Sequence, residues 1–236
     1  ISYNSKMDDI FEMDDIFEMD ALVFEGGGVK GIAHCGALMQ LEMLGVEIDD
    51  INFLAGTSAG SQIATLLACG YSVDELKIII TNMPLEDFKD KSCGCFRNMT
   101  RLICSYGMFK GNFMENYIDD LIATKLGKKK ATFMDLYIQT LKMLRITGTC
   151  LTTSTLEYFD VLTTPDMPLS KAVRISSGIP LFYTAVKYDG KHYVDGGVIR
   201  NLPVFAFPKI NTMFLTFKDE VVKDKNRKPK TKITNL

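Results

Sequence analysis

Three short glycine-containing motifs carry side chains suited to acyl-transfer chemistry. The first is GTSAG, made of Gly56, Thr57, Ser58, Ala59 and Gly60. This G-x-S-x-G pattern is typical of a serine nucleophile on a sharp strand-to-helix turn. A nucleophilic serine needs a base, and the usual base is histidine. The chain has only two histidines, His34 and His192, so the first question is what would activate Ser58.

Neither histidine is well placed by its sequence context. His34 falls inside a helix predicted from about residue 29 to 44, among small apolar residues, which favours a packed, structural side chain. His192 stands three residues before Asp195 in a predicted strand, KHYVD. Because side chains alternate along a strand, these two should face opposite ways. If Asp195 reaches Ser58, His192 does not.

Asp195 is the remaining candidate base. It is followed by Gly196 and Gly197, which permit an abrupt turn and leave the carboxylate unobstructed. By itself D-G-G is an ordinary turn. Together with Ser58 it suggests a Ser–Asp dyad that works without imidazole. The free pKa of an aspartate, about 3.9, makes it a poor base in water, but partial burial would raise it.

The third motif is a glycine loop, EGGGVKG, which contains Gly26, Gly27, Gly28, Val29, Lys30 and Gly31. Directly after a strand and before a helix, it matches the G-x-G-x-x-G pattern of dinucleotide-binding proteins. The acids near the expected distance, Glu47, Asp49 and Asp50, precede the second predicted strand instead of ending it. Alternatively, the loop's backbone N–H groups face a developing oxyanion. Lys30 could hold the loop in shape or be a plain surface lysine.

Around these motifs, strand and helix patterns alternate. The predicted elements are strands at 21–24 and 51–56, helices at about 29–44 and 59–69, a capping box at 72–75 that opens another helix, a helix at 112–126, strands at 141–151 and 156–162, and a hairpin turn at Asp189-Gly190. This alternation predicts an α/β domain with a largely parallel sheet.

EGGGVKG, GTSAG and DGG, in that order, resemble the motifs of the patatin-like phospholipases. The likeness continues in TFMDL (132–136), LRITGTCLTT (144–153), AVRISSGIPLFY (172–183) and YVDGGVIRNLP (193–203). It covers roughly residues 20–217. Lys30 stands where the family often has arginine, and Cys150 where many relatives have aspartate. Residues 84–111 match no pattern of the family, which leaves substrate choice open.

The resemblance implies a three-layer α/β/α sandwich and a dyad of Ser58 as nucleophile and Asp195 as base. It also implies an oxyanion hole of backbone N–H groups around Gly27, Gly28 and Val29, with no metal or organic cofactor. The expected function is that of a calcium-independent lipid acyl hydrolase of the phospholipase A or lysophospholipase type. Acyl transfer through the same acyl-enzyme, a non-catalytic lipid-binding or scaffold role, and a dinucleotide-dependent activity are the alternatives.

The charge balance limits which classes of binding partner are expected. A net charge of −2 over 236 residues gives no global attraction to nucleic acid. The expected partners are a phospholipid or other acyl lipid and, transiently, a membrane surface, with no nucleic acid. The first candidate for membrane contact is the mixed apolar and basic stretch 93–114, although a packed cap is the simpler interpretation.

Three regions are expected along the chain: an acidic repeat arm at 1–19, a catalytic domain at 20–217 and a basic tail at 218–236. No apolar run reaches membrane-spanning length and the first residues lack a signal-peptide order. Six irregularly spaced cysteines favour reduced thiols, hence a cytoplasmic or peripheral membrane protein. Cys93 and Cys95 form C-G-C, but no second pair follows at ligand spacing, so no metal site is expected.

Overall fold

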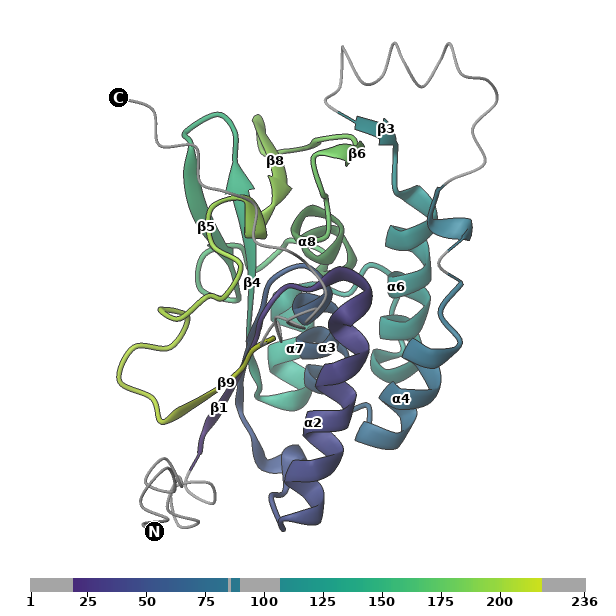
Figure 1. The fold of residues 1–236 in the computed structure, drawn as a ribbon. Helices are drawn as coiled ribbons and strands as arrows, with labels where there is room; N and C mark the ends of the chain where they lie inside the picture. The colour runs from purple at the N-terminus through teal and green to yellow at the C-terminus, as the bar shows by residue number, and fades with distance from the viewer. Residues whose placement is uncertain (1–18, 85, 90–106, 218–236) are drawn as a thin grey trace, which may run out of the picture.

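The computed structural model describes residues 19–84, 86–89 and 107–217 (Figure 1). The strands are β1 (Ala21–Phe24), β2 (Phe53–Gly56), β3 (Gly107–Phe109), β4 (Met143–Cys150), β5 (Thr155–Phe159), β6 (Leu181–Tyr183), β7 (Val186–Tyr188), β8 (Lys191–Asp195) and β9 (Thr212–Leu215). The α-helices are α2 (Ile32–Met43), α3 (Ala59–Ala68), α4 (Val73–Thr81), α6 (Asn112–Leu126), α7 (Phe133–Thr140) and α8 (Leu169–Ser176). Single 3-10 turns are η1 (Gly28–Gly31), η2 (Ile48–Asp50), η3 (Asp87–Lys89) and η4 (Gly196–Val198).

The central sheet has a parallel core and an antiparallel margin. Its strand order is β7-β8-β4-β2-β1-β9, with β5 also paired to β4. The four strands β4, β2, β1 and β9 are parallel. The pairs β4–β5, β4–β8 and β7–β8 are antiparallel. The β7–β8 hairpin turns at Asp189 and Gly190, both at positive φ, as the Asp-Gly signal predicts.

Strand β4 has two successive neighbours along one edge. Its first half, from Met143 to Ile146, pairs with β2, and its second half, from Gly148 to Cys150, pairs with β8. The other edge of the second half is occupied by β5. Strands β2 and β8 therefore approach each other end to end beside β4. Because β8 runs antiparallel to β4, its last residue is the one nearest the end of β2.

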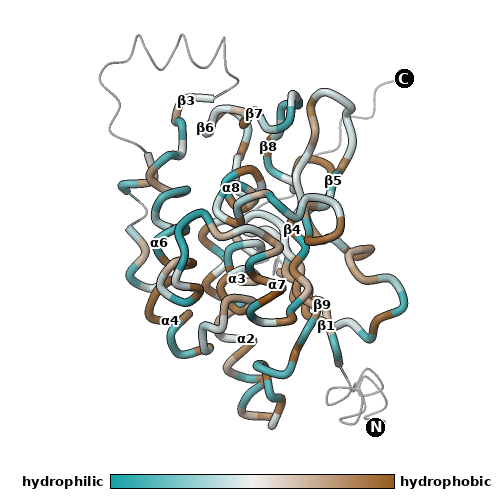
Figure 2. Tube along the Cα trace, turned by 180° about the vertical axis from the view of Figure 1, so that it is seen from behind, coloured by the Kyte–Doolittle hydropathy of each residue, from teal (hydrophilic) through white to brown (hydrophobic). Residues whose placement is uncertain are grey.

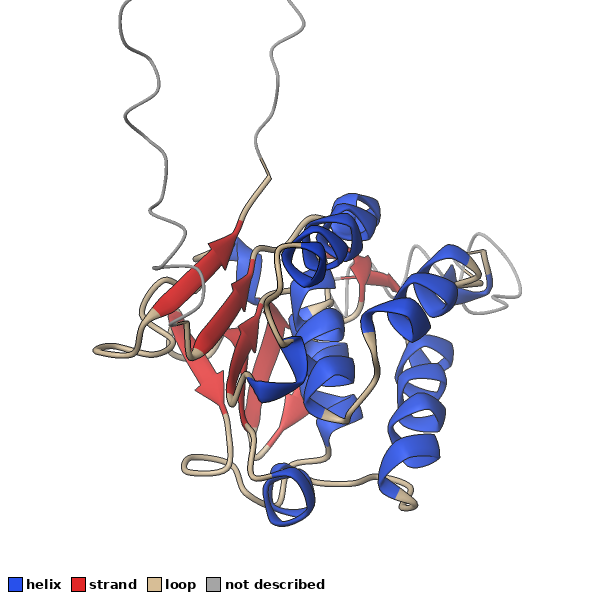
Figure 3. Cartoon of the chain, turned by 90° about the horizontal axis from the view of Figure 1, so that it is seen from below, coloured by secondary structure: helices blue, strands red, loops and turns tan. Residues whose placement is uncertain are grey.

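The two faces of the sheet are covered differently. Leu22, Phe24 and Leu54 point into the main hydrophobic core, which also takes in apolar side chains of each α-helix in the described ranges. Figure 3 shows most of the helices gathered against this face of the strands, and Figure 2 shows hydrophobic segments concentrated in the same interior. The alternate residues Val23 and Ala55 form a smaller cluster on the opposite face. That cluster is covered by apolar side chains of the segment 202–210.

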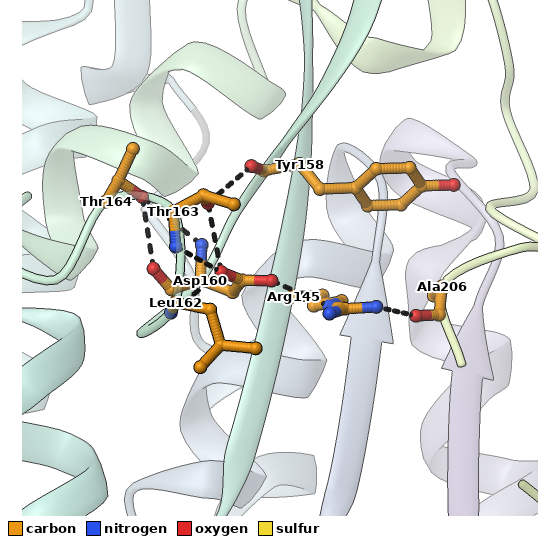
Figure 4. A network of polar contacts seen from close by, with 7 residues as sticks. All are labelled: Arg145, Tyr158, Asp160, Leu162, Thr163, Thr164 and Ala206. Atoms are coloured by element: carbon orange, nitrogen blue, oxygen red, sulfur yellow. Dashed lines mark hydrogen bonds and ion pairs between the residues drawn. The ribbon is translucent and has the colours of Figure 1, made fainter. Parts of the chain in front are cut away.

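A partly buried ion pair fixes this second covering layer to the sheet (Figure 4). The Nε of Arg145 on β4 lies 2.7 Å from a carboxylate oxygen of Asp160, which is only 1% exposed. Asp160 also accepts backbone N–H bonds from Leu162 and Thr163. The guanidinium donates a further bond to the carbonyl oxygen of Ala206. One arginine thus ties the turn after β5 to the 202–210 segment.

Local signals explain where several helices begin and end. The Ser72–Glu75 capping box that the sequence predicts is present at the start of α4, with both reciprocal bonds formed. A second box, Thr132 with Asp135, opens α7. Gly127 in the left-handed conformation ends α6. The predicted strands and helices thus occur with shifts of at most three residues at their ends, which is the usual uncertainty of element boundaries.

Candidate active site

Ser58 lies at the apex of a sharp turn between β2 and α3. Its φ of 53° and ψ of −123° are unusual for a residue with a side chain. The turn closes only because its neighbours lack side chains. A Cβ on Gly56 would lie 2.3 Å from the carbonyl oxygen of Gly60, and a Cβ on Gly60 would lie 2.5 Å from that of Phe24. Strand, elbow and helix therefore pack in contact, as the G-x-S-x-G spacing predicts.

Polar contacts from the adjoining helix and from distant segments hold this strained turn. The Ser58 backbone N–H donates to the Oγ of Ser176, at the end of α8, over 2.9 Å. The Oγ of Ser61 donates to the Ser58 carbonyl oxygen over 2.6 Å. The hydroxyls of Thr57 and Thr147 are 2.7 Å apart across β2 and β4. Since its own N–H is already bonded to Ser176, Ser58 cannot use that group to hold an oxyanion.

Strand register brings Asp195 to Ser58. Gly56 is paired with Ile146 and Asp195 with Gly148, two residues further along β4. Ser58, two residues after Gly56, is therefore level with the end of β8. The Ser58 hydroxyl lies near the Asp195 carboxylate and acts to lower the pKa of that group. Both residues are buried, at 7% and 5% exposure.

Burial dominates the electrostatics of Asp195. Desolvation raises its pKa to about 6, against the opposing effects of the Gly197 N–H bond and of the nearby Ser58 hydroxyl. The Gly197 N–H bond, 2.7 Å to Oδ1, also fixes the orientation of the carboxylate. Gly196 packs against Thr147, where a Cβ would lie 2.2 Å from the threonine Oγ1. The glycines of D-G-G thus permit the close approach to Thr147 as well as the turn.

The glycine loop faces the same point from the end of β1. Gly26 donates its N–H to the Asn201 carbonyl oxygen over 3.1 Å, and Lys30 donates its N–H to Gly27 over 3.0 Å. The N–H groups of Gly27, Gly28 and Val29 make no such bond within the described part of the chain. Gly28 adopts a φ of 54°, which glycine accepts without strain. Three backbone donors at the start of η1 and α2 are therefore available to an anion.

An apolar cavity of ≈ 490 Å³ opens beside Ser58. Its walls include exposed residues of the glycine loop and of the segment after α8, and buried residues of α6, η3 and β6. The lining residues include Val29, Ile32, Ile179, Phe88, Met114 and Tyr183. Val29, Ile32 and Ile179 are 78%, 52% and 47% exposed and mark the mouth, whereas Met114 is 2% exposed and marks the interior. This volume lies within the range of small-molecule sites.

The two histidines take the positions that the sequence predicts. His34 is buried in α2, where its Nε2 lies 2.9 Å from the Glu25 carbonyl oxygen and burial lowers its pKa. Its ring packs against Phe24 and Phe217. His192 is exposed, while Asp195 on the same strand is buried. Neither ring lines the cavity beside Ser58.

The geometry also weighs against dinucleotide binding. Strands β1 and β2 are parallel, with Phe24 paired to Gly56. The glycine loop therefore lies at the carboxyl ends of the strands, together with Ser58. Asp49 and Asp50, in η2, precede β2 and therefore lie at the amino-terminal ends of these strands. They are too far along the strand direction to hold a ribose that is bound at the glycine loop.

Two residues of the site carried no sequence signal of their own. Ser176, which holds the elbow, and Asn201, which contacts the glycine loop, are separated from their partners by 118 and 175 residues. Ser176 lies in AVRISSGIPLFY (172–183) and Asn201 in YVDGGVIRNLP (193–203). Nothing in their own spacing assigns either residue a role. Within the described residues no group of three or more His, Cys, Asp or Glu side chains could hold a metal ion.

Several sequence predictions concern residues outside the described ranges. The acidic repeat, the basic tail, the Cys93–Cys95 pair and residues 93–106 of the candidate membrane stretch all lie there. The remainder of that stretch forms β3 and the start of α6, where Met114 is packed in the interior. Among the helices that can be described, none is both long and apolar enough to cross a membrane.

Comparison with known proteins gives a consistent result. A sequence model of the family described as "Patatin-like phospholipase" matches residues 22–208. The chain is 35% identical over 201 residues to the uncharacterized protein YqhO of Bacillus subtilis, covering 79% of this chain and 66% of YqhO. It is 30% identical over 186 residues to the probable lipid hydrolase 463L of Invertebrate iridescent virus 6, covering 78% and 61%. The chain thus spans less than two thirds of these relatives.

Solved structures share the fold. VipD from Legionella pneumophila superposes with a TM-score of 0.63 at 21% identity, covering 88% of this chain and 52% of VipD. ExoU from Pseudomonas aeruginosa, solved as a heterodimeric complex with SpcU, gives a TM-score of 0.53 at 27% identity, covering 69% and 36%. The layered α/β class predicted from the sequence is confirmed by these neighbours and by the sheet itself.

Proposed function

The chain belongs to the patatin-like phospholipase family, and from this we propose that it hydrolyses fatty acyl esters of lipids through an acyl-serine intermediate, with Ser58 as nucleophile and Asp195 as base. The observation that carries the proposal is the buried Asp195 carboxylate, which lies near the Ser58 hydroxyl beside an apolar cavity. Phospholipids and lysophospholipids are the proposed substrates.

In the first half-reaction, Asp195 takes the Ser58 proton as Oγ bonds to the acyl carbonyl carbon. The carbonyl oxygen becomes an oxyanion, which the N–H groups of Gly27, Gly28 and Val29 stabilise. The tetrahedral intermediate collapses with cleavage of the ester C–O bond. The leaving alcohol receives the proton from Asp195, and the acyl group remains on Ser58.

Water completes the cycle by the reverse order of proton transfers. Asp195 takes a proton from a water molecule as its oxygen attacks the acyl carbon. Collapse of the second intermediate breaks the bond to Ser58 Oγ, which recovers its proton, and releases the fatty acid. A base with a pKa of about 6 is ionised at neutral pH yet more basic than a free aspartate. Each step uses groups of the chain, so activity is expected without calcium.

A lipid substrate must reach the cavity from an interface. The exposed side chains of Val29, Ile32 and Ile179 surround the mouth and would contact the acyl region of a lipid surface. This arrangement supports transient membrane contact through the mouth itself. Transfer of the acyl group to an acceptor other than water would use the same first half-reaction.

The proposal is tested by release of fatty acid from mixed phospholipid and lysophospholipid vesicles in the presence of EDTA. Wild type should release fatty acid, and both Ser58→Ala and Asp195→Asn should lose at least about 10³-fold in rate. A fluorophosphonate should label wild type and leave Ser58→Ala unlabelled. Loss in Ser58→Ala with full retention in Asp195→Asn would contradict the assignment of the base. Labelling without fatty acid release, but with acyl transfer to an added alcohol, would favour the acyltransferase alternative.

A further inference from the structure

Asn201 lies between the two loops that build the proposed site. It follows Asp195 by six residues, in the segment after η4, yet it contacts the glycine loop after β1. Its Nδ2 donates to the carbonyl oxygen of Gly26 over 2.7 Å and to Oε1 of Glu25 over 3.0 Å. In return the Gly26 N–H donates to the Asn201 backbone carbonyl. Both hydrogens of the amide are therefore used, and both backbone polar groups of Gly26, its N–H and its C=O, are bonded to Asn201.

The space around this amide exists because two motif positions are glycine. A Cβ on Gly26 would lie 2.3 Å from Asn201 Oδ1, and a Cβ on Gly197 would lie 2.9 Å from the same atom. The same Gly26 Cβ would lie 3.2 Å from Cβ of Ser58, and the Gly197 Cβ would lie 3.1 Å from Asp195 Oδ1. One side chain thus sits within contact distance of the backbone on both sides of the dyad.

Glu25 extends the connection. Its Oε1 accepts the bond from Asn201, and its Oε2 accepts the backbone N–H of Phe217 over 2.8 Å. The ring of Phe217 lies so close to Gly27 that a Cβ there would be 2.4 Å from it. The carboxylate therefore anchors Asn201 from one side while the segment after β9 covers the loop from the other.

We infer that the Glu25–Asn201 pair is a positioning clasp, which sets the glycine loop's N–H donors relative to Ser58 and Asp195. The inference rests on the proposed function, since it concerns the oxyanion donors of that reaction. A run of three glycines is conformationally permissive, and donors stabilise an oxyanion only when they are fixed in place beforehand. The clasp supplies that constraint from the same segment that carries the base. Asn201 is exposed, so its role in folding should be small.

The test compares Asn201→Ala and Asn201→Asp with wild type on a soluble p-nitrophenyl ester. Asn201→Ala should lower kcat by roughly 10- to 100-fold, since a misplacement of about 1 Å at a reacting site can cost that much. KM should change little, because the acyl cavity does not include Asn201. Asn201→Asp should lower kcat further, because a carboxylate then faces the Gly26 carbonyl and the Glu25 carboxylate. Asn82→Ala is the matched control, since Asn82 is an exposed asparagine that also donates to a backbone carbonyl.

A pair of inhibitors separates positioning from general damage. An alkyl trifluoromethyl ketone forms a hemiketal with the serine and places an oxyanion at the donors, whereas the matched alkyl methyl ketone has the same chain and forms no stable hemiketal. In Asn201→Ala the affinity for the trifluoromethyl ketone should fall by the same factor as kcat/KM. The affinity for the methyl ketone should stay at the wild-type value. The thermal midpoint should stay within roughly 2 °C.

Each other outcome overturns a specific statement. A wild-type kcat in Asn201→Ala overturns the clasp and leaves the proposed function intact. An equal loss of affinity for both ketones, together with a lowered thermal midpoint, would show that the contact is merely structural. This result also overturns the clasp. A folded wild type that neither hydrolyses the ester nor reacts with a fluorophosphonate overturns the proposed function, and the inference with it.

Discussion

At the scale of single residues, Asp195 serves two opposed requirements. As a proposed base it gains proton affinity from burial, which raises its pKa to about 6. The same burial makes its ionised form costly in the folded state, because few groups compensate the lost hydration. Activity at neutral pH therefore requires the form of Asp195 that stabilises the fold least.

This conflict predicts that Asp195→Asn inactivates the protein and makes it more stable at neutral pH. The folded pKa of about 6 lies above the unfolded value of 3.8. Stability from this group is therefore fully present below pH 3.8 and is lost as the pH rises through 6. A neutral amide avoids that loss, which is on the order of 3 kcal/mol. Chemical denaturation should show the gain at pH 7.5 and little or none at pH 4.

Asp135→Asn is the control of opposite sign. Lys128 and the N-terminal bonds of α7 lower the pKa of Asp135, so its ionised form stabilises the fold. Its replacement should reduce stability at pH 7.5 and matter less as the pH falls. If Asp195→Asn were less stable than wild type at neutral pH, the burial argument would be wrong.

At the scale of elements, the elbow depends on how closely α3 approaches β1. A Cβ on Gly60 would lie 2.5 Å from the Phe24 carbonyl oxygen and 2.7 Å from that of Glu25. These are backbone atoms at the start of the glycine loop, so neither can move without displacing the loop.

Gly60→Ala should therefore lower the free energy of unfolding by roughly 2–4 kcal/mol and reduce ester hydrolysis as well. Gly36→Ala, in the middle of α2, has nothing within 4 Å of its added Cβ. It should instead raise stability by about 0.4–1 kcal/mol and leave hydrolysis unchanged. Denaturation midpoints and p-nitrophenyl ester rates of the two variants check this pair. Equal effects of the two substitutions would contradict the packing argument.

Elements with strong local signals were predictable. The strands at 21–24 and 53–56 are apolar runs at whose ends glycines occur, and the capping box of α4 is local. Helix α8 is harder to predict, because buried Ser170, Arg174 and Ser176 interrupt its apolar pattern. Strands β3 and β6 are only three residues long. The motifs identify Ser58, Asp195 and the glycine loop as candidates, but the supports from Ser176 and Asn201 depend on tertiary contacts that spacing does not encode.

At the scale of the whole molecule, the cavity extends inward from its mouth, near the carboxyl ends of β1 and β2, to a separate apolar cluster. Phe88, Met114 and Tyr183 form that cluster, apart from the main core. All three also line the cavity. Their burial places them at its inner end, where a long acyl chain would terminate.

Met114 is therefore predicted to limit acyl chain length. Met114→Trp should shift the preferred p-nitrophenyl ester toward shorter chains, with a loss of about fourfold in kcat/KM for each methylene that no longer fits. Met114→Ala should shift it toward longer chains. The control is Met43→Trp, since Met43 is 80% exposed at the end of α2. An unchanged chain-length profile in both Met114 variants would place the acyl chain elsewhere.

The end-to-end meeting of β2 and β8 has a consequence for the order of synthesis. A ribosome that has made residues 1–190 has supplied the elbow, the glycine loop and the cavity lining, but not Asp195 or Asn201. The last described strand, β9, completes the sheet by pairing with the first, β1. Nascent and prematurely terminated chains of this length would therefore offer an apolar surface without the proposed base. The proposed capacity to hydrolyse lipid esters would therefore be acquired only after residues 191–215, which carry Asp195, Asn201 and β9, fold back onto the strands made first.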